Sequence, residues 1–332
     1  MQTARPVQSD IDFDDVRALV AADLDAVDAL IRSSLTSDVR LVSDVAEYIV
    51  SGGGKRLRPV VVLLAARALG CRGDGHHTLA AIVEFIHTAT LLHDDVVDGS
   101  ERRRGKATAN QVFGNQASVL VGDFLYSRSF QMMVSLGQLP VMDVLADATN
   151  TIAAGEVMQL MNVHNPNTDE AQYREVIYRK TAKLFEAGAE LGALIAGASN
   201  AQRDALATYG RELGVAFQLI DDLLDYAADS ADLGKNVGDD LAEGKPTLPL
   251  IYALSQCSEL EHELLRKVIL KGGRGDIDRV LAIVESTGAL QYTARRAQEA
   301  AAMAVAALDP IPESDYKRAL QTIAEFSVQR SR

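Results

Sequence analysis

The chain has 332 residues, of which 48% are hydrophobic and 5% aromatic, and its formal net charge is −13. Such an acidic composition disfavours a nucleic-acid partner, because binding to a phosphate backbone requires a basic face, and it opposes attraction to anionic lipid. No apolar stretch approaches the roughly 20 residues that a membrane span needs. The two cysteines, Cys71 and Cys257, lie far apart, so we expect a cytoplasmic protein without a membrane span or a disulfide framework.

Apolar residues recur at helical spacing through most of the chain, which predicts an all-α fold. Residues 1–10 are polar and are expected to form a flexible segment. Because no convincing linker or internal repeat interrupts the remainder, residues 11–332 are expected to form a single domain. Helices are predicted at about 12–31, 42–50, 60–69, 78–98, 117–136, 141–163, 173–196 and 203–226, then around Ala253 and Val268, and at 277–283 and 316–327.

A glycine-rich turn precedes the third predicted helix. Residues 52–54 are all glycine, and the cations Lys55, Arg56 and Arg58 follow at once. Free backbone amides and the positive end of a helix can hold a phosphate at such a turn. A turn without a ligand fits the same residues equally well. In that interpretation the glycines end one helix, the cations are exposed to solvent, and the proline starts the next helix.

The helix predicted at 78–98 ends in a group of carboxylates. Asp94 and Asp98 are four residues apart, so they share one face of the helix with Cβ atoms about 6 Å apart, close enough to share a hard cation. His87 precedes Asp94 by two turns and lies close to the same face. A histidine on such a helix is more often a core residue, but the neighbouring carboxylates favour a functional role.

The helix predicted at 173–196 is interrupted by Arg179, Lys180 and Thr181. A cation and a hydroxyl group suit an anion there, although a solvated lysine on an outer face explains the same pattern. The segment that follows the next helix, 227–244, is rich in aspartate and glycine. It is expected to act as a mobile lid.

A second acidic cluster repeats the spacing of the first. Asp221, Asp222 and Asp225 follow Gln218 on the helix predicted at 203–226. Two inward-facing acidic clusters would repel each other unless cations lay between them. Mg²⁺ fits, because it favours carboxylates together with phosphate oxygens of a substrate. The sequence therefore predicts a magnesium site that receives diphosphates, with the basic residues as a second means of holding phosphate.

Other chemistries fit these motifs less well. A carboxylate-bridged di-iron bundle needs Glu-x-x-His pairs, which neither aspartate cluster supplies. The chain contains no Walker loop for nucleotide phosphates. It also lacks the nucleophile elbow of a serine hydrolase.

Five motifs cover the chain from about residue 50 to 250. They lie at 52–59, 94–98 with 103–105, 180–181, 218–225 and 244–247. Taken in this order, they resemble the all-trans polyprenyl diphosphate synthase family, and most of all its long-chain members. The resemblance implies a single bundle of antiparallel helices around a deep central cavity, a homodimer, and two to three Mg²⁺ ions held with the substrate diphosphates.

The resemblance also implies roles for individual residues. Mg²⁺ ligands are expected at Asp94, Asp98, Asp221, Asp222 and Asp225. Isopentenyl diphosphate is expected to be bound by Lys55, Arg58, His87 and Arg104. The allylic diphosphate is expected to be bound by Arg103, Lys180, Thr181, Gln218, Lys235 and Lys245.

The implied activity is Mg²⁺-dependent condensation of an allylic diphosphate with successive isopentenyl diphosphates. Ala89 and Thr90 are small where short-chain members carry a bulky aromatic, which implies a product of heptaprenyl to decaprenyl length, although a helical wheel turns Ala89 away from the cavity. The stretch 155–162 also resembles long-chain members. Such a membrane-directed product suits the side chain of a respiratory quinone.

Three alternatives stay open at this point. A short-chain synthase of farnesyl or geranylgeranyl diphosphate would share the same scaffold. A non-catalytic subunit of a heteromeric synthase would be expected to lose metal carboxylates or the glycine-rich turn, and this chain keeps both. A terpene cyclase fits less well, because its second metal cluster carries an Asn/Ser/Glu pattern in place of three aspartates.

Overall fold

The computed structural model of the protein describes residues 13–50, 52–103, 105–227 and 238–329. The segment 1–10, most of the expected lid, and the predicted cations Arg104 and Lys235 lie outside these residues. The helices are α1 (Phe13–Leu19), α2 (Ala21–Ser34), α3 (Arg40–Val50), α4 (Leu57–Ala68), α5 (Gly75–Val97), α6 (Ala109–Phe113), α7 (Asn115–Ser135), α8 (Leu139–Asn162), α9 (Glu170–Ile177), the π-helix η1 (Tyr178–Ala182), α10 (Lys183–Ile195), α11 (Asn200–Leu224), α12 (Asp239–Ala242), α13 (Leu248–Gln256), α14 (Glu259–Lys271), α15 (Ile277–Ser286), α16 (Ala289–Ala307) and α17 (Asp315–Gln329).

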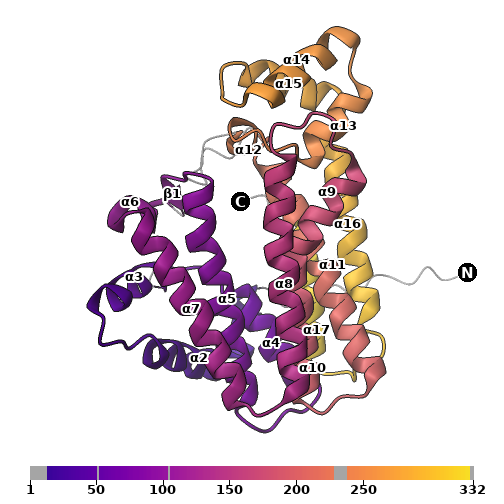
Figure 1. Cartoon of the computed structure of the whole chain (residues 1–332). Coiled ribbons are helices and arrows are strands. Elements are labelled where there is room, and N and C mark those ends of the chain that lie inside the picture. Colours follow the sequence, from indigo (N-terminus) through magenta and orange to yellow (C-terminus); the bar gives the residue numbers. More distant parts are fainter. Residues whose placement is uncertain (1–12, 51, 104, 228–237, 330–332) are drawn as a thin grey trace, which may run out of the picture.

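The long helices run side by side and form the body of the molecule (Figure 1). Helix α4 lies in its interior: residues 60–66 are all fully buried, as expected for a helical segment that is apolar on every face. It packs against α5 and α10, while α5 also packs against α7 and α11 against α10 and α16. The all-α prediction is confirmed for the described residues.

The two strands found among the described residues form one short hairpin. β1 (Arg102–Arg103) pairs antiparallel with β2 (Lys106–Ala107), and Arg103 lies opposite Lys106. The hairpin directly follows the carboxylate-bearing end of α5, where Figure 1 labels β1. A ladder of two residues is too short to leave an alternating pattern in the sequence, which is why it was not predicted.

Most predicted helices are found, with shifted ends. Asp169 and Gln172 form a capping box that starts α9 at Glu170. The interruption predicted at Arg179–Thr181 takes the form of the π-helix η1. Helix α16 was missed, and its run of alanines explains why, since alanine carries little of the apolar contrast on which periodicity depends.

A second apolar cluster lies at one end of the molecule. Buried residues of α13, α14 and α15, among them Leu250, Leu265, Ile269 and Val280, pack together there. Helices α14 and α15 lie beyond α12 in Figure 1. Among the described residues, no helix combines the length and the apolarity that crossing a bilayer requires.

Candidate active site

A cavity of about 500 Å³ lies between α5, α8, η1 and α11. Both aspartate clusters reach it, so their predicted inward orientation is confirmed for the residues that line it. Residues of α4, α9, α12, the strand β1 and the loop before α13 also line it. The predicted site residues in its lining are Arg58, His87, Thr90, Asp94, Asp98, Arg103, Lys180, Thr181, Gln218, Asp221, Asp222 and Lys245.

The first cluster places two carboxylates against two lysines. The ammonium group of Lys180 lies 3.4 Å from Asp94 Oδ2, and that of Lys245 donates to Asp98 Oδ2 at 2.8 Å. Burial raises the pKa of Asp94, although Lys180 opposes the shift. Burial alone would lower the pKa of Lys245, but the charges of Asp98 and Glu243 raise it.

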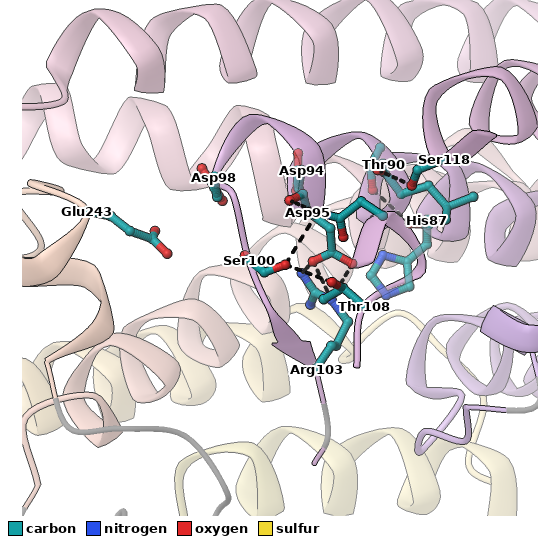
Figure 2. Close-up of polar contacts among 12 residues, drawn as sticks. His87, Thr90, Asp94, Asp95, Asp98, Ser100, Arg103, Thr108, Ser118 and Glu243 are labelled. Atoms are coloured by element: carbon teal, nitrogen blue, oxygen red, sulfur yellow. Dashed lines mark hydrogen bonds and ion pairs between the residues drawn. The ribbon is translucent and has the colours of Figure 1, made fainter. Parts of the chain in front are cut away.

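The middle aspartate of the first cluster has a different role. Figure 2 shows Asp95 turned toward Arg103, whereas Asp94 points to the other side of the helix. Asp95 is 1% exposed, and Oδ1 accepts hydrogen bonds from Arg103 Nη2 at 2.7 Å and Nε at 3.0 Å. Asn110 donates to its backbone carbonyl at 3.2 Å. Asp95 therefore fixes Arg103 at the cavity wall, a role that the sequence did not reveal.

In the second cluster, Asp222 ends a chain of hydrogen bonds. The hydroxyl group of Tyr173 donates to Asp222 Oδ2 at 2.5 Å, and Gln218 Nε2 donates to Oδ1 at 2.7 Å. Thr181 Oγ1 in turn donates to Gln218 Oε1 at 2.8 Å. Burial raises the pKa of Asp222 well above its usual value, and the charge of Asp240 adds to the shift. The chain orients the Gln218 amide, and Tyr173 is a member that sequence reasoning missed.

Asp225 lies at the edge of this arrangement and does not line the cavity. Its carboxylate accepts hydrogen bonds from the backbone N–H groups of Asp239 and Asp240, both at 3.1 Å. These are the first residues of α12, so Asp225 ties that helix to the end of α11. Asp240 itself lines the cavity and was not among the predicted residues.

A second cavity of about 350 Å³ adjoins the first, and Arg58, His87 and Phe217 line both. Arg58 Nη1 lies 3.2 Å from His87 Nε2, and its guanidinium group stacks 4.4 Å from the ring centre of Phe185. The ammonium group of Lys55 lies 4.9 Å from the ring centre of Phe326. Lys55, Arg58 and His87 therefore lie together beside the main cavity. They are three of the four residues predicted to bind isopentenyl diphosphate.

The two residues expected to set product length occupy different environments. Thr90 lines the main cavity, and its hydroxyl group donates to the His87 carbonyl oxygen at 2.8 Å. Ala89 is fully buried in the core and is absent from the cavity lining. The helical wheel had indicated this difference, because neighbouring residues on a helix point about 100° apart.

The donor set of the main cavity suits a hard divalent cation. Asp94, Asp98 and Asp221 offer only carboxylate oxygens, which Mg²⁺ prefers, and the lining contains no cysteine that would favour a softer metal. Lys180 and Lys245 line the same cavity, so the site can hold an anion as well.

The chain is similar to known proteins in sequence and in fold. The chain matches the model of the polyprenyl synthetase family over residues 39–286. It is 53% identical to octaprenyl diphosphate synthase of Escherichia coli (strain K12) over 323 residues, which cover 97% of this chain and 100% of the relative. It is 45% identical to the all-trans-nonaprenyl-diphosphate synthase (geranyl-diphosphate specific) of Rhodobacter capsulatus, with coverage of 96% and 99%. A polyprenyl synthase from Caulobacter crescentus CB15, complexed with calcium and isoprenyl diphosphate, matches with a TM-score of 0.93 at 45% identity, covering 97% of this chain and 99% of that one.

Proposed function

The chain belongs to the polyprenyl synthetase family and is a trans-prenyltransferase that makes medium- to long-chain all-trans polyprenyl diphosphates, and from this premise we propose how its residues carry out the reaction. One observation carries the proposal. Both aspartate clusters and two lysines face a single cavity, and that cavity adjoins a second, cationic one. The allylic diphosphate would bind in the first, and isopentenyl diphosphate in the second.

Divalent cations are proposed to bind between the clusters in a set of two to three ions. Their ligands would be Asp94 on α5, Asp98 at the C-cap of α5, and Asp221 on α11. Asp222 and Asp225 are proposed to support this set indirectly. Asp222 is 4% exposed and both of its carboxylate oxygens accept hydrogen bonds, from Tyr173 and Gln218. Asp225 does not line the cavity. When bound, Mg²⁺ supplies charge neutralisation of the diphosphate as its carbon–oxygen bond breaks.

The cations of the first cavity are proposed to bind the allylic diphosphate. Arg103 is held in place by Asp95, so its remaining N–H groups are preorganised for phosphate oxygens. Lys180 on η1 and Lys245 in the loop before α13 add two ammonium groups. Their charges favour the departing pyrophosphate over the intact ester, which is the difference that accelerates the reaction.

The hydrogen-bonded pair Thr181 and Gln218 is proposed to face the allylic carbon as positive charge develops on it. Lys55, Arg58 and His87 would hold isopentenyl diphosphate so that its double bond attacks that carbon. The new carbon–carbon bond would form as the carbon–oxygen bond breaks. The positive charge left on the isopentenyl unit would then be removed by loss of a proton from that unit to the departing pyrophosphate. Arg104 and Lys235 are proposed to add charge to the two diphosphate sites, on the strength of the sequence motifs alone.

Assembly and cellular role are part of the same proposal. We infer a cytoplasmic homodimer whose product serves as the side chain of a respiratory quinone. Large apolar side chains on the outer faces of α7 and α8 support the dimer, because a second copy would cover them: Leu120, Val134, Leu160 and Met161 are 66%, 60%, 62% and 76% exposed.

The test is to incubate the purified chain with Mg²⁺, farnesyl diphosphate and labelled isopentenyl diphosphate. Pyrophosphate release and a product of heptaprenyl to decaprenyl length, identified by mass, are expected. An active enzyme that stops at farnesyl or geranylgeranyl length would refute the assignment of product length. A chain that releases no pyrophosphate would revive the non-catalytic subunit.

A further inference from the structure

Glu156 is a carboxylate of the main cavity that belongs to neither aspartate cluster. It lies on α8 and lines the cavity, where its Oε2 accepts a hydrogen bond from the ammonium group of Lys180 at 2.6 Å. Asp94 lies on the other side of the same ammonium group, at 3.4 Å. Lys180 is therefore held between two helices, with the shorter contact to Glu156.

Helix α8 and the π-helix η1 approach each other closely beside the pair of Glu156 and Lys180. Gly155 packs against η1 so tightly that an added Cβ would lie 2.6 Å from Arg179 Cβ and 2.9 Å from the backbone nitrogen of Lys180. A side chain at Gly155 would push α8 away from η1, since one of the atoms it meets is backbone. The π-helix at this point also changes the direction of Lys180 relative to a regular helix, a feature that recurs at functional sites.

The contact to Glu156 remains available when Asp94 takes up its proposed metal. An ammonium group has three hydrogen-bond donors, so Lys180 can bind Glu156 and still present donors to a diphosphate. A free lysine side chain has many rotamers, and a fixed partner removes that freedom before substrate arrives.

We propose that Glu156 is a positioning residue, which holds the ammonium group of Lys180 toward the allylic diphosphate through each round of elongation. The inference rests on the proposed role of Lys180. Glu156 does not contact the reacting atoms in this proposal and acts only through the lysine. Its effect should therefore be confined to the allylic substrate.

Replacing Glu156 with leucine is the primary test. Glu156→Leu should raise KM for farnesyl diphosphate about 10- to 100-fold, as expected for loss of a hydrogen bond to a charged group, and leave KM for isopentenyl diphosphate unchanged. Glu156→Gln keeps an oxygen acceptor for Lys180 and should recover most of the affinity. Gly155→Ala should reproduce the leucine result in a milder form, because it separates α8 from η1.

Asp147 provides a matched control on the same helix. It makes a comparable ion pair with Lys183, at 2.8 Å, on the side of α8 that does not line the cavity. Asp147→Leu should leave both KM values unchanged. A double-mutant cycle with Lys180→Ala completes the design: if Glu156 acts through Lys180, adding Glu156→Leu to that variant should cause no further rise in KM.

Several results would overturn the proposal. Equal rises in both KM values, or additive effects in the cycle, would mean that Glu156 does not act through Lys180. A fall in kcat alone would indicate a catalytic group, and a higher Mg²⁺ requirement would indicate a metal ligand. An inactive wild-type chain would refute the proposed function itself, whereas an active wild type with an unaffected Glu156→Leu variant would refute only this inference.

Discussion

Replacing Thr90 with phenylalanine should shorten the product. Thr90 lines the main cavity four residues before Asp94, so it lies about 6 Å along the helix from that carboxylate at a rise of 1.5 Å per residue. Its hydroxyl group donates only to the His87 carbonyl oxygen of the same helix, and losing such a bond costs at most about 1.5 kcal/mol. A ring at this depth would block the growing chain and leave the fold and the diphosphate sites intact.

Ala89→Phe provides the contrast, because Ala89 is fully buried and does not line the cavity. A ring forced into the core should destabilise the fold by about 1–3 kcal/mol or more. At about 2–4 °C per kcal/mol for a chain of roughly this size, the melting temperature should fall by several degrees. The length of the product should stay as in the wild type.

The assay is mass analysis of products made from farnesyl diphosphate and labelled isopentenyl diphosphate, together with thermal unfolding of each variant. Thr90→Phe should give a product shorter by at least two isoprene units and retain the first condensation. A folded Thr90→Phe variant with unchanged product length would contradict the reasoning. So would an Ala89→Phe variant that shortens the product without losing stability.

Three further outcomes are expected. Asp94→Asn should lower kcat about 10²- to 10³-fold, by analogy with removal of one preorganised stabilising group, as measured by pyrophosphate release. Asp95→Ala should free Arg103 from its bidentate contact and raise KM for the allylic substrate more than for isopentenyl diphosphate in steady-state kinetics. Burial alone would raise the pKa of Asp23, but hydrogen bonding to Arg67 holds it well below its usual value. The stability that the ionised Asp23 contributes is complete above about pH 4 and is lost as the pH falls further. The free energy of unfolding of Asp23→Asn, measured in urea, should therefore depend less on acidic pH than that of the wild type.

The sequence predicted the parts of the site that depend on one helix. Asp94 and Asp98 share a face by spacing alone, and the structure places both at the cavity. Asp95 could not be interpreted in the same way. Its role depends on Arg103, which is positioned by a hairpin of two-residue strands that has no sequence signature.

Contacts between helices were harder to predict. Glu156 is one of many glutamates at helical spacing, and nothing local marks it as the partner of Lys180. The pair forms only because Gly155 lets α8 approach η1 and because a π-helix replaces regular helix there. Helical periodicity assumes 3.6 residues per turn, so it cannot locate an irregular turn or the side chains that the turn redirects.

The structure also explains the third aspartate of the second cluster, which does not line the cavity. Asp225 accepts the first backbone N–H groups of α12, and the loop that follows carries Lys245. Lys245 in turn bridges to Asp98 in the first cluster. If Asp98 binds a metal and Lys245 a diphosphate, as proposed, that bridge must be exchanged for contacts with the ligands. Asp225 would keep α12 anchored to α11 during the exchange, so that Lys245 moves over a short distance and returns to the same place in the next round of elongation.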